Sequence, residues 1–150
     1  MCHIDDYVYD ICVDTLNEDS HNFFANGILV HNTDSVSNNS IVKTTMHPDG
    51  ISIESFYNEN IGTRGESTAS GHESVSTTDT VLNFNNDKIL PVNVKRIIRH
   101  KVNKPKYRIT TASGKSIECT SDHSLIVFRN GEKIEIKPSE IHDGDKVLVI

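Results

Sequence analysis

The sequence predicts an all-β fold, and three observations support that prediction. β-Branched and aromatic residues gather in short runs along the chain, apolar and polar residues alternate within several of these runs, and turn-forming residues separate them. At 150 residues, the chain is long enough for one domain with a buried core. Only 35% of the residues are hydrophobic, so we expect part of the chain to lie outside that core.

The first expected strand covers residues 4–16, where Tyr7, Tyr9, Ile11 and Val13 share one parity. The region 51–57 is expected to be a strand that runs into a helical turn, and a second helical turn is expected at 138–140. The same criteria predict further strands at residues 21–25, 28–30, 41–43, 81–84, 89–100, 107–111, 117–120, 125–128, 134–136 and 146–150.

Glycine, proline and asparagine mark the turns between these strands. The Asn26-Gly27 pair is a strong hairpin signal, and proline and glycine preset the turn at 48–50. Other turns are expected at 17–20, 38–39, 113–114, 130–131 and 143–145. Residues 58–80 consist mainly of serine, threonine, glycine, glutamate and asparagine, and we expect them to form a long mobile or disordered insert.

Composition excludes several classes of function. The net charge is -6 and no basic stretch is evident, which argues against direct nucleic-acid binding. No apolar run reaches membrane-spanning length, and the N-terminus has no signal-peptide character. The three cysteines are odd in number and lack metal-ligand spacing, which favours a reducing compartment such as the cytoplasm.

Residues 27–35 (Gly-Ile-Leu-Val-His-Asn-Thr-Asp-Ser) combine a short buried strand with reactive side chains. The side-chain amide of Asn32 can attack its own C-terminal peptide bond, closing a succinimide and cutting the chain. His31 can donate a proton to that bond, and the hydroxyls of Thr33 and Ser35 lie on neighbouring peptide bonds. These groups therefore address the backbone itself rather than a bound substrate.

Several ordered motifs resemble inteins of the kind inserted in family B DNA polymerases, which are protein-splicing domains of the horseshoe-like, all-β HINT (hedgehog/intein) fold. Residues 8–13, 21–23, 25–27 and 30–32 resemble the C-terminal splicing motifs of that family. Residues 114–117 and 120–125 resemble the internal Thr-x-x-His motif, and residues 129–131 and 141–145 resemble the last motif of the N-terminal half. Residues 35–42 resemble the opening motif. In the opening motif, Asn39 and Ser40 stand where the family has Asp-Thr.

The order of these motifs is reversed, so the chain resembles a circularly permuted intein or a split intein with its C-terminal half placed first. We expect residues 1–32 to be the C-terminal half, 33–34 residual extein residues, and 35–150 the N-terminal half, with no homing endonuclease domain. Spacing within the opening motif favours Ser35 over Ser37 as the first intein residue. Whether the permutation is natural or engineered stays open at this point.

On the N-terminal side, the resemblance implies that the Ser35 hydroxyl attacks the Asp34 carbonyl at the splice junction and converts the amide to an ester. Thr120 and His123 match the family residues that hold and protonate this junction. A serine hydroxyl is a weak nucleophile unless such groups assist it.

On the C-terminal side, the resemblance implies that the Thr33 hydroxyl attacks the ester with help from Asp10. Asn32 then cyclises, assisted by His31 and His21. This is single-turnover self-processing without a cofactor or metal. The permuted chain is expected to stall as a precursor, because complete splicing would excise Thr33 and Asp34 as a cyclic dipeptide.

Two other interpretations compete with splicing. His21, His31 and His123 could instead be ligands of a structural zinc ion in a β domain, and zinc that resists chelation would favour that interpretation. The Thr33-Asp34-Ser35 run also echoes a polymerase metal motif, but no helical polymerase pattern accompanies it. Under the splicing interpretation, the host extein is a family B DNA polymerase and no membrane is involved. The permuted chain requires no partner, whereas in a natural split form the two intein halves associate with each other.

Overall fold

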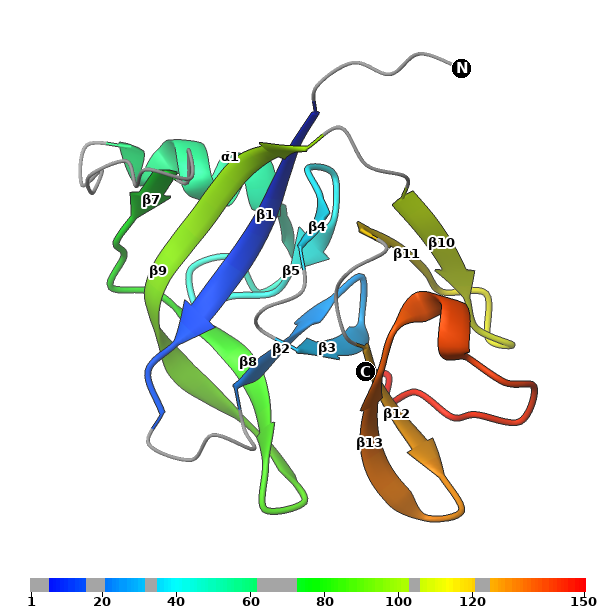
Figure 1. Cartoon of the computed structure of the whole chain (residues 1–150). Helices are drawn as coiled ribbons and strands as arrows, with labels where there is room; N and C mark the ends of the chain where they lie inside the picture. The colour runs from blue at the N-terminus through cyan, green and yellow to red at the C-terminus, as the bar shows by residue number, and fades with distance from the viewer. Residues whose placement is uncertain (1–5, 16–20, 32–34, 62–72, 103–105, 121–124) are drawn as a thin grey trace.

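The computed structural model describes residues 6–15, 21–31, 35–61, 73–102, 106–120 and 125–150. Within these ranges, two curled sheets lie beside each other, accompanied by a small two-stranded sheet and the short helix α1, as Figure 1 shows. The predicted all-β fold is therefore confirmed, and the curled sheets agree with a HINT-like arrangement.

The larger sheet has seven strands. Its main path runs in the order β10 (Lys106–Thr110), β11 (Ser116–Thr120), β4 (Val36–Ser37), β1 (Asp6–Val13), β9 (Lys88–Val102) and β7 (Glu73–Val75), and β8 (Thr80–Asn85) pairs with β9 outside this path. The 15-residue strand β9 pairs with β1, β7 and β8, so it joins the sheet along most of its length. The short strand β4 connects β11 to β1.

The smaller sheet has the order β13 (Glu132–Ile136), β12 (Leu125–Arg129), β3 (Ile28–His31) and β2 (Asn22–Ala25). Its hairpin β2–β3 turns at Asn26 and Gly27, whose φ angles are 52° and 77°. Positive φ at both central positions is the geometry that an Asn-Gly hairpin turn requires. The predicted hairpin is confirmed, and it positions the strand that ends in His31.

A small sheet of β5 (Ile41–Val42) and β6 (Ile51–Ser52) precedes α1 (Ile53–Glu59). The Ser52 hydroxyl caps the helix by accepting a hydrogen bond of 3.2 Å from the Ser55 amide. The expected passage from strand to helix is thus confirmed, as is the helical turn at Pro138–Glu140, which is a 3-10 helix.

One large apolar cluster packs the two main sheets and α1 against each other. Strands β1, β3 and β11, together with α1, contribute to it, and its fully buried members include Ile11, Val30, Ile117, Phe56 and Tyr57. Each such side chain stabilises the fold by roughly 1.5–3 kcal/mol. Because the same cluster contacts each of these strands, it fixes the ends of β3 and β4 relative to β1 and β11.

The prediction of an insert over 58–80 is wrong at both of its ends. Helix α1 extends through Glu59, β7 occupies Glu73–Val75, and β8 begins at Thr80. Strand β7 is stabilised by its ladder with β9 and by an ion pair of 3.3 Å between the Arg99 Nε and Glu73 Oε1 atoms. Residues 62–72, to which the rest of the prediction applies, lie outside the described part of the chain, as does the turn expected at 17–20.

The last apolar run is not the continuous strand that its sequence predicts. It forms two isolated bridges, Lys146 to Phe128 and Val149 to Ile28. Leu148 and Ile150 pack against a second, smaller cluster that contains Phe24, Leu29 and Ile126. Apolar packing, rather than a regular ladder, therefore accounts for the hydrophobic character of residues 146–150.

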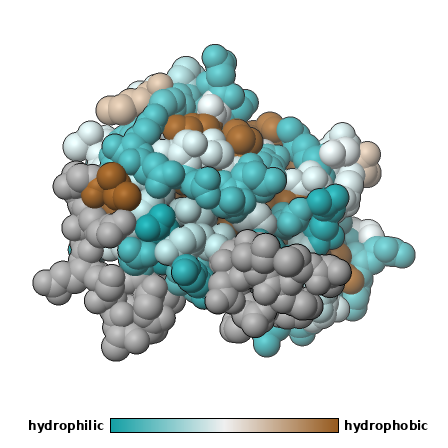
Figure 2. All heavy atoms as spheres, turned by 90° about the horizontal axis from the view of Figure 1, so that it is seen from above, coloured by the Kyte–Doolittle hydropathy of each residue, from teal (hydrophilic) through white to brown (hydrophobic). Residues whose placement is uncertain are grey.

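The exposed apolar residues on one face of the molecule are scattered (Figure 2). On the face seen in Figure 2, brown apolar residues outside the grey atoms form separate small areas between hydrophilic ones. Exposed large apolar side chains in the described ranges include Met46 at 65% and Leu90 at 57% exposure. Scattered exposed residues of this kind are normal for a folded domain.

Candidate active site

Ser35 lies between two other predicted site residues at the start of β4. The next residue, Val36, pairs with Tyr9 of β1 on one side and with Cys119 of β11 on the other. Both pairings are antiparallel, so extending each register by one residue places Ser35 opposite Asp10 and opposite Thr120. Side chains of directly opposed residues point to the same face of a sheet. The topology thus brings two hydroxyl groups and a carboxylate into one row.

A backbone hydrogen bond fixes one half of this row. The Thr120 amide donates to the Ser35 carbonyl oxygen at 3.4 Å. Both residues are buried, with Ser35 only 2% and Thr120 0% exposed. A buried site keeps bulk water away from the reacting groups, and interactions between polar groups are stronger there than in water.

The Thr120 hydroxyl is buried and has no hydrogen-bond partner among the residues that the structure describes. Buried hydroxyls in proteins usually have a partner, and a buried polar group without one costs about 1–3 kcal/mol. This hydroxyl lies in the row that contains Ser35, beside the ends of the segments 32–34 and 121–124. Its hydrogen-bonding capacity is therefore not used by any residue in the described part of the chain.

The second part of the site is the end of hairpin β2–β3. His31 pairs with Asn22 across the hairpin, and its Nε2 atom lies 3.4 Å from Oε1 of Glu135 on β13. Burial lowers the pKa of His31 below its ordinary value, whereas the Glu135 carboxylate acts to raise it. Positive charge on His21 or Lys133 acts in the same direction as burial. At neutral pH, His31 is therefore mainly the neutral imidazole.

His21 lies immediately before β2 and close enough to His31 for its charge to affect the pKa of His31. Its Nε2 atom is 3.2 Å from the backbone oxygen of Thr15, so this nitrogen carries the proton and donates it. The hairpin therefore brings His21 to the same end as His31.

The side chain of Asn22 links the hairpin to β8. Its amide group makes a pair of hydrogen bonds with the backbone of β8, as a neighbouring strand would. Its Nδ2 atom donates to the Phe84 carbonyl oxygen at 2.9 Å, and its Oδ1 atom accepts from the Phe84 amide at 2.9 Å. The side-chain Nδ2 atom of Asn83 donates to both the backbone oxygen and the Oδ1 atom of Asn22, at 3.0 Å each. Since Asn22 pairs directly with His31, these hydrogen bonds also fix the position of His31 at the end of β3.

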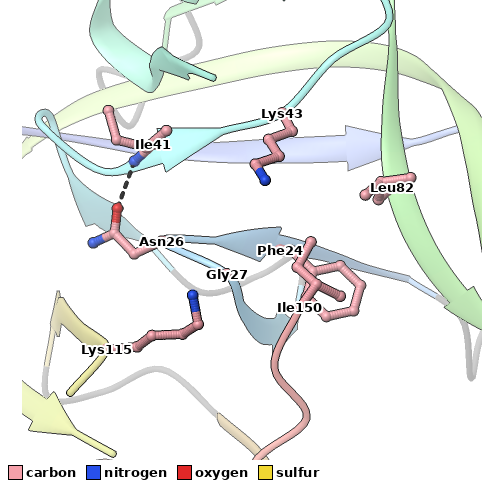
Figure 3. A pocket seen from close by; sticks show the side chains of 8 residues that line it. All are labelled: Phe24, Asn26, Gly27, Ile41, Lys43, Leu82, Lys115 and Ile150. Carbon is pink, nitrogen blue, oxygen red and sulfur yellow. Dashed lines mark hydrogen bonds between the residues drawn. The ribbon is translucent and has the colours of Figure 1, made fainter. Parts of the chain in front are cut away.

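The hairpin tip is held from its other side. Asn26 accepts a hydrogen bond of 2.7 Å from the Ile41 amide and donates one of 2.9 Å to the Ser116 carbonyl oxygen. Figure 3 shows the Asn26–Ile41 bond at the edge of a cavity of about 120 Å³, with the Lys43 and Lys115 ammonium groups pointing toward it from opposite sides. A Cβ atom on Gly27 would lie only 3.0 Å from the Lys115 Nζ atom and from the Ile150 backbone oxygen.

Four predicted site residues lie outside the described part of the chain: Asn32, Thr33, Asp34 and His123. Their immediate neighbours His31 and Ser35 are described, and so is Thr120, three residues before His123. The structure thus brings Ser35, Asp10 and Thr120 together in one sheet, and His21 and His31 together at the hairpin.

The sequence analysis did not single out Glu135, Asn22 or Asn83, whose contacts near the site are with residues far away in the sequence. Glu135 belongs to an alternating strand with no motif around it, so no local signal marks it. Asn22 belongs to the His-Asn-Phe motif, but its partners lie about sixty residues away in β8. Asn83 interrupts the apolar run of β8 and is 2% exposed, and a polar residue within a strand run is the one signal that could have indicated a buried role.

In the described ranges, no group of three or more histidine, cysteine, aspartate or glutamate side chains could hold a metal ion. The alternative zinc set requires His123, which those ranges do not include. The model also contains, in its described parts, no helix with the length and apolar character needed to cross a membrane.

Comparison with known proteins defines the class of this domain. Residues 44–150 match the family model described as the intein splicing domain. A 56-residue stretch is 43% identical to part of the DNA polymerase of Thermococcus sp. (strain GE8) and covers 37% of this chain and 3% of that protein. The DNA polymerase of Thermococcus kodakarensis is 45% identical over 56 residues, with the same coverage of both chains.

A longer stretch of 84 residues is 33% identical to part of the DNA polymerase of Methanocaldococcus jannaschii, covering 53% of this chain and 5% of that protein. The chain thus spans only a few per cent of the length of these relatives. The match over 44–150 covers most of the chain, and the chain belongs to the intein splicing domain family. Protein splicing is the reaction of this family.

Proposed function

We propose that this chain carries the machinery of autocatalytic splicing, with Ser35, Thr33 and Asn32 as its reacting residues, and that in its present segment order it stalls before splicing is complete. The observation that most supports this proposal is the position of the buried Ser35 in one sheet row between Asp10 and Thr120. Such a row places a nucleophile beside one acid–base group and one hydrogen-bond donor. Holding the reacting atoms together supplies much of the acceleration, since effective molarities reach roughly 10⁵–10⁸ M.

In the first step, the Ser35 Oγ atom attacks the Asp34 carbonyl carbon, and the C–N bond between the two residues breaks. The hydroxyl proton is transferred to the released Ser35 amino group, so the amide becomes an ester without any added reactant. Thr120 and His123 are the proposed donors to the carbonyl oxygen and to the leaving nitrogen. One such donor is worth on the order of 10²–10³-fold in rate.

In the second step, the Thr33 hydroxyl displaces Ser35 from the ester, and the Ser35 oxygen regains a proton. The proposed role of Asp10 is to accept the Thr33 proton and to return one to Ser35. Its register position opposite Ser35 supports this role, because a group that serves both hydroxyls must lie beside one of them.

In the third step, the Asn32 side-chain nitrogen attacks its own carbonyl carbon and the peptide bond to Thr33 breaks. The attacking nitrogen loses a proton and the leaving Thr33 nitrogen gains one. His31 and His21 are the proposed proton carriers, and their closeness at the hairpin end supports this pairing. A final acyl shift from oxygen to nitrogen restores the amide between the exteins.

Local contacts favour Ser35 over Ser37 as the nucleophile. Ser37 lies inside the β4 ladder, where it pairs with Val8, and its hydroxyl donates a 3.4 Å hydrogen bond to the Glu118 carboxylate. Ser35 instead precedes the strand, next to the junction segment. A nucleophile must reach the peptide bond that precedes it, and the Ser35 hydroxyl has no ladder position of its own to hold it away from that bond.

We further propose that the chain is permuted, with residues 1–32 as the C-terminal half, 33–34 as extein remnants and 35–150 as the N-terminal half. In a split form, the two halves would associate by forming the pairings of β1 with β4 and β9. The host would be a DNA polymerase, in line with the names of the relatives. Excising Thr33 and Asp34 as a cyclic dipeptide requires a cis peptide bond, disfavoured by about 2.5–4 kcal/mol, so the precursor stalls.

Trapping with hydroxylamine tests the assignment of the nucleophile. Hydroxylamine cleaves an ester at Asp34–Ser35 and releases residues 35–150 together with residues 1–34 as a hydroxamate. Mass spectrometry separates these products from cuts at the two Asn-Gly bonds, which hydroxylamine also attacks. We expect Ser35→Ala to abolish the 35–150 product and Ser37→Ala to retain it, whereas the reverse pattern would overturn the assignment.

A further inference from the structure

Glu135 faces His31 from a strand that is not adjacent to it. Strand β12 lies between β3 and β13, with Leu125 opposite both Val30 and Ile136. The Glu135 side chain reaches diagonally across β12, and its Oε1 atom lies 3.4 Å from the His31 Nε2 atom. The His31 side chain is 19% exposed and that of Glu135 is 49% exposed, so the pair lies at the edge of the core.

A carboxylate next to one imidazole nitrogen determines which nitrogen carries the proton. With Glu135 beside Nε2, the neutral ring carries its proton on Nε2 and leaves Nδ1 as the acceptor. When the ring gains a second proton, that proton resides on Nδ1, while Nε2 remains directed at Glu135. The group that can give a proton to a leaving nitrogen is then Nδ1–H.

We propose that Glu135 is a positioning residue for His31, fixing its tautomer and favouring its protonated form during Asn32 cyclisation. This inference rests on the proposed role of His31 in breaking the Asn32–Thr33 bond. In this role Glu135 acts only through the imidazole of His31. Its role parallels that of the carboxylates that orient histidines in other sites.

Three charged or titratable residues affect the pKa of His31. Glu135 and Lys133 lie on β13 with the same parity and act in opposite directions on the pKa of His31, while His21 acts from the segment before β2. Strand β13 therefore carries both a group that favours His31 protonation and one that opposes it. Substituting each separately gives opposite expected shifts, which a general loss of structure would not produce.

The first experiment is an NMR titration of His31 in the full chain carrying Asn32→Ala, which prevents cleavage during the measurement. We expect Glu135→Gln to move the His31 titration midpoint down by about 0.3–0.7 pH units and Lys133→Gln to move it up. Glu132→Gln, an exposed glutamate on the same strand, is the matched control and leaves the midpoint unchanged. Ring nitrogen shifts should show the Nε2–H tautomer in the Asn32→Ala chain and a tautomer mixture after Glu135→Ala.

The second experiment follows cleavage before Thr33 against pH in otherwise unaltered chains. We expect its alkaline limb, along which cleavage slows as His31 loses its proton, to move down with Glu135→Gln and up with Lys133→Gln, by the same amounts as the midpoints. The positioning role is wrong if the His31 titration midpoint is the same in Glu135→Gln as in Glu132→Gln and Glu135→Ala leaves the His31 tautomer unchanged. If the titration shifts but cleavage does not follow it, the proposed role of His31 is wrong while the His31–Glu135 pairing stands.

Discussion

The amide of Thr120 donates to the carbonyl oxygen of Ser35 at 3.4 Å, which joins the end of β11 to the start of β4. The bond places the Thr120 hydroxyl in the row that contains Ser35, although 84 residues separate the two in the sequence. It therefore connects the Thr-x-x-His motif to the proposed splice junction.

Thr120→Val replaces the hydroxyl by a methyl group of similar volume. We expect hydroxylamine-induced release of residues 35–150 to slow about 10²–10³-fold, because one donor to the junction carbonyl is lost. The free energy of unfolding should stay the same or rise, because the buried hydroxyl has no described partner to lose. Thr110→Val on β10 is the control, and equal slowing in both variants would remove Thr120 from the mechanism.

Asn22→Ala removes the side chain that secures β2 to β8. The Phe84 amide and carbonyl and the Asn83 side chain lose partners in a buried site, so we expect the free energy of unfolding to fall by about 3 kcal/mol. Urea unfolding measures this change. The exposed Asn93→Ala should change it by less than about 0.5 kcal/mol, and a similarly small effect of Asn22→Ala would show that the Asn22 hydrogen bonds are not stabilising.

Gly27→Ala and Gly114→Ala separate backbone strain from crowding. Both glycines have positive φ, 77° and 91°, so alanine is strained at each by roughly 1–2 kcal/mol. Only at Gly27 would the new Cβ meet other atoms, at 3.0 Å, whereas at Gly114 nothing lies within 4 Å. Thermal unfolding should therefore show the larger loss for Gly27→Ala, and equal losses would mean that the hairpin tip can shift to accommodate the methyl group.

Acid stability should depend on Asp145. Hydrogen bonds from the Arg129 guanidinium, both 2.7 Å, and from the His142 amide hold the pKa of this carboxyl well below its usual range. A lowered pKa in the folded state adds stability that is complete above the unfolded-state pKa of about 3.9 and is lost as pH falls below it. Urea midpoints of the unaltered chain should thus fall more steeply between pH 5 and pH 2 than those of Asp145→Asn; parallel curves would contradict this.

The strands were predictable because their patterning is local. Alternation in residues 6–13 and the two Asn-Gly turns indicated β1 and both hairpins directly. Strand β7 was missed because Glu-Ser-Val carries no pattern of its own and depends on β9 for its partner. Residues 146–150 were wrongly predicted as a continuous strand. Apolar residues that pack without a ladder have the same sequence pattern as a buried strand.

The candidate site was predicted through local motifs, and a motif match also covers residues that the structure does not describe. Asp10, Ser35 and Thr120 were identified by their motifs, but their common row depends on two long-range registers through Val36. Glu135 could not be found from sequence, because its relation to His31 is a diagonal contact across a third strand.

The most direct test of the central claim is the intact mass of the full chain after incubation. The account predicts mostly full-length protein, with slow release of residues 1–32 that is one water lighter than the free acid, as a C-terminal succinimide requires. Asn32→Ala should abolish that product while leaving the hydroxylamine-sensitive bond before Ser35. Release of residues 1–32 at an equal rate from Asn32→Ala, or a fully excised Thr33–Asp34 dipeptide, would contradict the account.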